Sequence, residues 1–80
     1  MNLTVYYKSD KNSYIEEKIL SLAETYGGKL IQDFSMDNFN EFVCILKFAS
    51  HAQEEAFKKE VKTLSIHLKI QISFGGHVSL

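Results

Sequence analysis

The stretch EFVCILKF, residues 41–48, is the clearest candidate for a central β-strand in the sequence. Apolar side chains fall on both of its alternating faces, a pattern that favours a strand with neighbours on both edges. Shorter runs at residues 3–7 and 29–35, and a strictly alternating run at residues 66–74, predict three more strands. We therefore expect a sheet of four strands with residues 41–48 in its interior.

A first amphipathic helix is predicted between residues 13 and 26. Its apolar side chains recur at spacings of three and four residues. Ser13 with Glu16 has the spacing of a capping box, in which each side chain satisfies a free backbone N–H at the helix start. Gly27-Gly28 marks the end, because glycine adopts the left-handed conformation that closes helices.

A second helix is predicted to follow residues 41–48. Ser50 with Gln53 repeats the capping-box spacing, and apolar residues at helical spacing continue to about Thr63. Glu54 with Lys58 and Glu55 with Lys59 are spaced for supportive ion pairs, which indicates a solvated helix face.

The resulting order, β-α-β-β-α-β, resembles the ferredoxin-like or split β-α-β arrangement. The resemblance covers nearly the whole chain and implies an α+β fold in which two helices lie on one face of a four-stranded antiparallel sheet. Residues 1–80 are expected to form a single domain, with residues 76–80 as a flexible tail after Gly75-Gly76. Because this fold hosts many unrelated functions, the resemblance does not give an activity.

Composition narrows the function classes. All nine basic residues are lysines, and the absence of arginine disfavours sequence-specific recognition of nucleic acid. The single cysteine, Cys44, cannot form an internal disulfide, so we expect a reducing, cytoplasmic location. No apolar run approaches the ~20 residues that span a bilayer, and the start MNLTVYYKSD does not resemble a signal peptide, so no membrane contact is expected.

The alternation of side chains along the strands predicts which residues the helices leave uncovered. Leu30 and Phe34 are expected on the helix side, and Asp33 on the opposite, open side. The open side is predicted to have an apolar centre with a polar border, and these residues are our candidate partner-binding site: Tyr6, Ile31, Val43 and Ile45 in the centre, with Lys8, Lys47, His67 and Lys69 at the border.

An apolar patch with a polar border is typical of an interface. The plainer alternative is that valine and isoleucine are present only because they fit a pleated surface. We expect a non-enzymatic protein that regulates or inhibits a protein partner through this face or through a sheet edge, most simply as a homodimer. In fold and size, the chain resembles antitoxins and phage-encoded inhibitors such as anti-CRISPR proteins.

The sequence predicts no catalytic residue, metal site or cofactor. Zinc sites usually contain close ligand pairs such as C-x-x-C, which this sequence lacks. Cys44 falls on an inward position as a buried structural thiol, and His51, His67 and His77 lie on a predicted helix start, strand and tail as solvated or capping imidazoles. RNA recognition motifs share the fold but stack bases on aromatic side chains, where this chain has Val43 and Ile45. Nucleic acid is therefore not the expected partner.

Two alternatives remain open. Metal-dependent nucleases of the CRISPR-adaptation type share this fold and hold an acidic residue near the position of Asp10. Two copies of Asp10 in a dimer could bind Mg²⁺, which makes the chain a dimeric metal-dependent ribonuclease or nucleic-acid binder. The ordinary alternative is a polar loop that enters a helix. ACT domains also share the topology and bind small molecules at dimer contacts, which implies a small-molecule sensor.

Overall fold

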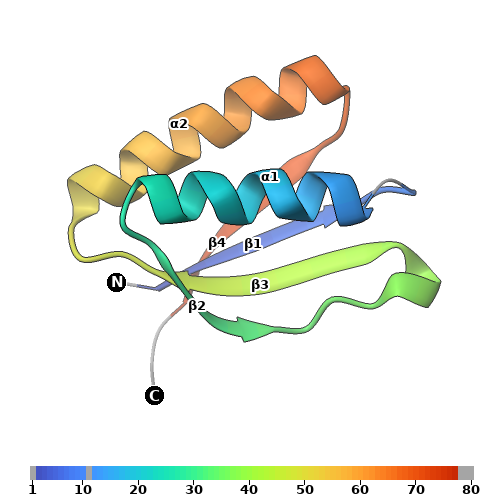
Figure 1. Cartoon of the computed structure of the whole chain (residues 1–80), viewed down its shortest axis with the longest axis horizontal. Helices are drawn as coiled ribbons and strands as arrows, with labels where there is room; N and C mark the ends of the chain where they lie inside the picture. Colours follow the sequence, from blue (N-terminus) through green and yellow to red (C-terminus); the bar gives the residue numbers. More distant parts are fainter. Residues whose placement is uncertain (1, 11, 78–80) are drawn as a thin grey trace.

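The computed structural model describes residues 2–10 and 12–77, without the side chains of residues 12, 13, 37, 76 and 77. Two helices lie on the same side of a single sheet (Figure 1). The elements are β1 (Asn2–Lys8), α1 (Asn12–Thr25), β2 (Lys29–Asp33), the short 3₁₀ helix η1 (Asp37–Phe39), β3 (Glu41–Lys47), α2 (His51–Leu68) and β4 (Ile72–His77).

The sheet has the strand order β2-β3-β1-β4, and all three neighbouring pairs are antiparallel. Each helix connects two strands that have a third strand between them, which is the interleaved connectivity of the split β-α-β arrangement. The predicted ferredoxin-like α+β fold is therefore confirmed. The interior position predicted for residues 41–48 is also confirmed, since β3 has neighbours on both edges.

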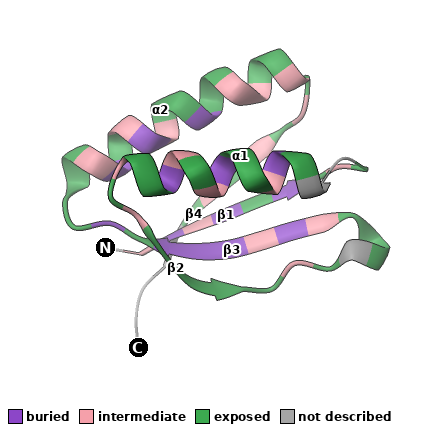
Figure 2. Ribbon diagram, viewed as in Figure 1, coloured by how far each residue is buried: buried purple, intermediate pink, exposed green. Residues whose placement is uncertain are grey.

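The core lies between the sheet and the helices. Every second residue of β1 and β3 is fully buried against apolar side chains of α1 and α2 (Figure 2). The rings of Tyr7 and Phe42 stack with centroids 4.7 Å apart, and those of Phe48 and Phe57 lie 5.1 Å apart. The core residues from the sheet are Leu3, Val5, Tyr7, Phe42, Cys44 and Leu46, as alternation predicts.

Helix α1 ends as expected. Gly27 has a left-handed φ of 77°, and the N–H of Gly28 donates to the carbonyl of Ala23 at 2.7 Å, which satisfies a carbonyl of the last turn. The helix begins at Asn12, one residue before the predicted cap Ser13, whose side chain lies outside the described residues.

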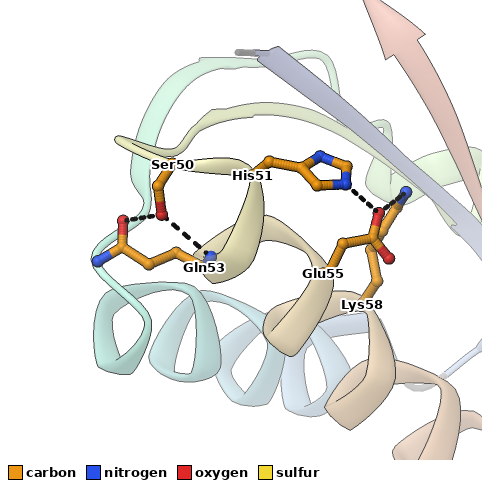
Figure 3. Close-up of polar contacts among 5 residues, drawn as sticks. All are labelled: Ser50, His51, Gln53, Glu55 and Lys58. Carbon is orange, nitrogen blue, oxygen red and sulfur yellow. Dashed lines mark hydrogen bonds and ion pairs between the residues drawn. The ribbon is translucent and has the colours of Figure 1, made fainter.

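Helix α2 begins with the predicted cap (Figure 3). The Ser50 hydroxyl accepts from the backbone N–H of Gln53 at 3.2 Å, and it also donates to the side-chain oxygen of Gln53 at 3.4 Å. The predicted ion pairs are wrong in detail. Lys58 pairs with Glu55 at 3.3 Å, Glu55 also contacts His51 at 3.6 Å, and Glu54 is buried.

The end of α2 is the largest departure from the sequence prediction. The helix continues to Leu68, so the predicted strand over residues 66–74 is wrong at its start, as is the helix end near Thr63. Residues 57, 61, 64 and 68 are apolar and continue the helical spacing, while Lys69 adopts the left-handed conformation (φ 56°) that closes the helix. The alternation typical of a strand and the spacing typical of a helix thus overlap at residues 66–68, and the segment is helical.

Strand β4 is correspondingly displaced toward the C-terminus. Gly75 lies opposite Thr4 and Gly76 opposite Leu3, so these glycines belong to the sheet and do not release a tail. Of the predicted tail, residues 76 and 77 are in the strand and residues 78–80 lie outside the described residues.

A β-bulge in β2 changes the phase of the edge strand. Leu30 lies opposite Leu46 and Gln32 opposite Ile45, which leaves Ile31 as the extra residue. Beyond the bulge Asp33 lies opposite Cys44, on the helix side, so Phe34 follows on the open side. The predicted positions of Asp33 and Phe34 are therefore both wrong.

The close approach of Gly28 to Phe48 gives a test of the packing beneath α1. A Cβ at Gly28 would lie 2.7 Å from the Phe48 ring, whereas a Cβ at Gly75 would lie 3.7 Å from that of Thr4. We expect Gly28→Ala to lower the free energy of unfolding by about 1–3 kcal/mol, because the buried ring must move. Gly75→Ala is the control and should cost less than about 0.5 kcal/mol in urea denaturation. Equal losses would contradict this packing.

Candidate functional site

The open face is the side of the sheet opposite the helices, and its residues lie in four rows across the strands. The rows follow from the strand registers and from the N–H of Phe34, which donates to the carbonyl of Val43 at 2.8 Å. The first row is Lys29, Lys47 and Asn2; the second is Gln32, Ile45, Thr4 and Gly75; the third is Phe34, Val43, Tyr6 and Ser73; the fourth is Met36, Glu41 and Lys8.

Apolar side chains are displayed on this face. Ile31, Phe34 and Met36 are 51%, 48% and 50% exposed, and Tyr6 is also exposed. Ile31 belongs to the open face because it alternates with Leu30, which faces the helices. An 80-residue chain has little apolar material to spare from its core, so this displayed apolar surface makes the open face a candidate site.

The four residues predicted for the centre of this surface all lie on the open face, but they differ in exposure. Tyr6, Ile31 and Val43 lie on the side away from the helices, as predicted. Ile45 also lies on that side, but it is only 6% exposed, because neighbouring strands flank it on both sides. Ile45 therefore forms the floor of the surface and offers little area to a partner.

The predicted border is right on one half of the sheet and wrong on the other. Lys8 and Lys47 are exposed on the open face. His67 lies in the last turn of α2 and Lys69 at its C-cap, so neither belongs to the sheet. The reason is the longer helix, which removes both residues from the strand in which alternation placed them.

Sequence reasoning missed Lys29, Phe34 and Met36 on this face. Lys29 lies directly opposite Lys47, so two like charges face each other in the first row. Glu41 is the single carboxylate among the four rows. Because Lys29 precedes Leu30 in the same strand, alternation could have placed Lys29 on the open face. Phe34 reaches the open face only because of the bulge.

A groove lies between the two helices, on the side of the molecule opposite the open face. The helices are further apart where α1 begins and α2 ends (Figure 1), and a groove of about 570 Å³ lies between these halves. Lys18 Nζ lies 5.0 Å from the centroid of the Tyr14 ring on its α1 wall. Further lining residues are Glu17, Leu22, Glu60, Leu64 and His67.

The buried thiol is not activated. Burial, together with smaller contributions from the nearby carboxylates of Asp33 and Glu16, raises the pKa of Cys44 from 9.0 to about 12. Burial also raises the pKa of Tyr7, with contributions from the same carboxylates. Cys44 is therefore a protonated thiol at neutral pH, which is a poor nucleophile.

The described residues contain neither a group suited to a metal ion nor a membrane-spanning helix. No group of three or more His, Cys, Asp and Glu residues there could hold a metal ion. Within the same residues, no helix is long and apolar enough to cross a membrane. Asp10 is exposed in the turn that follows β1.

Neither a protein-family model nor a curated protein matches this chain. Among solved structures, the chain is similar to formyltetrahydrofolate deformylase from Burkholderia mallei, with a TM-score of 0.62 and 14% sequence identity. The match covers 94% of this chain and 27% of the deformylase, so the chain spans about a quarter of that enzyme's length. This likeness supports the fold.

The raised pKa of Cys44 predicts that stability falls in alkali. Below about pH 9 the thiol is protonated in both the folded and the unfolded chain, and its contribution is complete. Between pH 9 and about 12 the unfolded chain loses the proton first, so the free energy of unfolding should decrease with pH. Cys44→Ala should make this decrease less steep, by up to about 1.4 kcal/mol per pH unit.

Urea denaturation over this pH range is the measurement. The slopes of the two proteins are compared, because Cys44→Ala also leaves a small cavity that lowers stability at every pH. Identical slopes in the two proteins would contradict the buried, protonated thiol.

Proposed function

We propose that this chain is a non-enzymatic, ACT-like regulatory domain that senses a small molecule. The observation that carries the proposal is the match to the deformylase, in which nearly all of this chain corresponds to about a quarter of a larger enzyme. A unit of this fold that forms one part of an enzyme suits a regulatory role beside a separate catalytic part. ACT domains have this topology and bind small-molecule ligands.

The groove between α1 and α2 is the candidate place for the ligand. Its volume lies within the range of about 300–1,000 Å³ that is usual for small-molecule sites. Leu22 and Leu64 supply apolar lining, Tyr14 supplies an aromatic face, and Lys18 and Glu60 supply charges of both signs. Such a mixture suits a small zwitterion with an apolar side chain, such as an amino acid.

A thermal-shift assay against a panel of amino acids tests the sensor. Binding to the folded state should raise the melting temperature, by several degrees at a ligand concentration about ten times the Kd. Tyr14→Ala should abolish the shift, whereas Phe39→Ala, which removes an equally exposed ring outside the groove, should retain it.

Absence of any shift across the panel would contradict the sensing role. A shift of equal size in Tyr14→Ala would contradict the groove as the ligand's site.

The second candidate function is regulation or inhibition of a protein partner in the cytoplasm, in the manner of an antitoxin or an anti-CRISPR protein. It is favoured by the exposed side chains of Ile31, Phe34 and Met36 on the open face. Phe34→Ser should prevent such a partner from co-purifying from native lysate, and its melting temperature should stay close to that of the parent because the ring is half exposed. Retention of the same partner by Phe34→Ser would remove this candidate.

A further inference from the structure

We propose that the open face binds the open face of a second copy of this chain, about a two-fold axis that runs across the strands between the second and third rows. This inference does not depend on the ligand-sensing function. It rests on the order of apolar and charged side chains in the four rows, which is self-complementary about that axis.

The second and third rows, which carry no charged side chain, face each other across this axis. The axis places β3 on β3 and sets the second row of one copy against the third row of the other. Ile45 then faces the second copy's Val43, and Gln32, with the bulged Ile31 beside it, faces its Phe34. The exposed ring of Tyr6 meets the smaller Thr4 of the second copy. Two sheets that pack face to face in this way lie about 10 Å apart, with their strands within about 30° of each other.

The charged rows then select this axis over its alternative. The same rotation sets the first row against the fourth, so that Lys47 faces the second copy's Glu41, twice by symmetry. An axis parallel to the strands and over β3 would instead set the first row against itself, and Lys47 would face its own copy. Like charges brought together at an interface oppose binding, so the crosswise axis is preferred.

A carboxylate from the second copy would relieve the repulsion between two lysines in the first row. Lys29 and Lys47 lie opposite each other, which costs free energy in an isolated sheet. In the described part of the chain, neither lysine forms an ion pair. The second copy's Glu41 would supply the missing negative charge at this end of the sheet.

Edge-to-edge pairing through β2 is the less suitable contact. The bulge between Leu30 and Gln32 interrupts the regular alternation of that strand, and Lys29 and Asp33 add charges at its two ends. Bulges and charges are the devices by which exposed strands avoid pairing with other chains. The second and third rows of the open face carry no charged side chain.

The size of the face sets the expected strength. Four strands about 4.8 Å apart and four rows about 6.7 Å apart span roughly 500 Å², about three-fifths of the 800 Å² that each partner contributes to a standard interface. We therefore expect a dimer with a Kd in the micromolar range, which sedimentation equilibrium of the full chain from about 5 to 500 μM would resolve.

Charge exchange tests the register directly. Lys47→Glu and Glu41→Lys should each weaken the dimer about tenfold or more, because each variant places like charges together twice. An equimolar mixture of the two variants should dimerise as the parent does, since both of its pairs are then opposite in sign. The double variant, Lys47→Glu with Glu41→Lys, should dimerise as well. Lys62→Glu, on the outer side of α2, is the control and should have no effect.

Three results would overturn the proposal: a parent that stays monomeric over the whole range, single variants that dimerise like the parent, or a mixture that remains monomeric. A monomeric parent would leave the face to a foreign partner. Phe34→Ser is tested in parallel, so that misfolding of a charge variant does not decide the outcome, and it too should weaken the dimer about tenfold. Tyr14 lies on the helix side, so these results are distinguishable from those of the ligand assay.

Discussion

The packing of both helices on one face of the β1–β3 pair is the constraint on which the rest of the structure depends. Alternate side chains of these two strands are fully buried beneath α1 and α2, and the stacked rings of Tyr7 and Phe42 join the strands where β1 ends and β3 begins. Because both helices lie on that side, none of the elements that the structure describes covers the opposite face. The open face is thus a direct consequence of the topology.

The order of the elements, the buried faces of β1 and β3, and the caps at Gly27 and Ser50 could be predicted from the sequence because each has a local cause. The wrong predictions arise where two local patterns compete. The segment around Ile66 and Leu68 satisfies both a strand period and a helix period, and packing of the longer α2 decides between them. A local pattern cannot show which of the two finds a partner surface.

The bulge in β2 is a different kind of failure, since nothing in the sequence around Ile31 indicates it. One extra residue reverses the alternation, brings Phe34 to the open face and turns Asp33 toward Cys44. The candidate site is therefore more apolar than the sequence predicts on the β2 side. It is less charged on the other side, because His67 and Lys69 belong to the end of α2. These changes together produce the self-complementary rows.

The two proposed contacts lie on opposite sides of the molecule, so one does not obstruct the other. The side of Phe34 is the most direct test of the account, because both the bulge and the open face depend on it. Nuclear Overhauser spectra of the full chain should show contacts between the Phe34 ring and the methyl groups of Val43, and none with the buried methyl groups of Ile15 or Ile19 on α1. Contacts of the ring with α1 in place of Val43 would contradict the phase of β2 and the surface built on it.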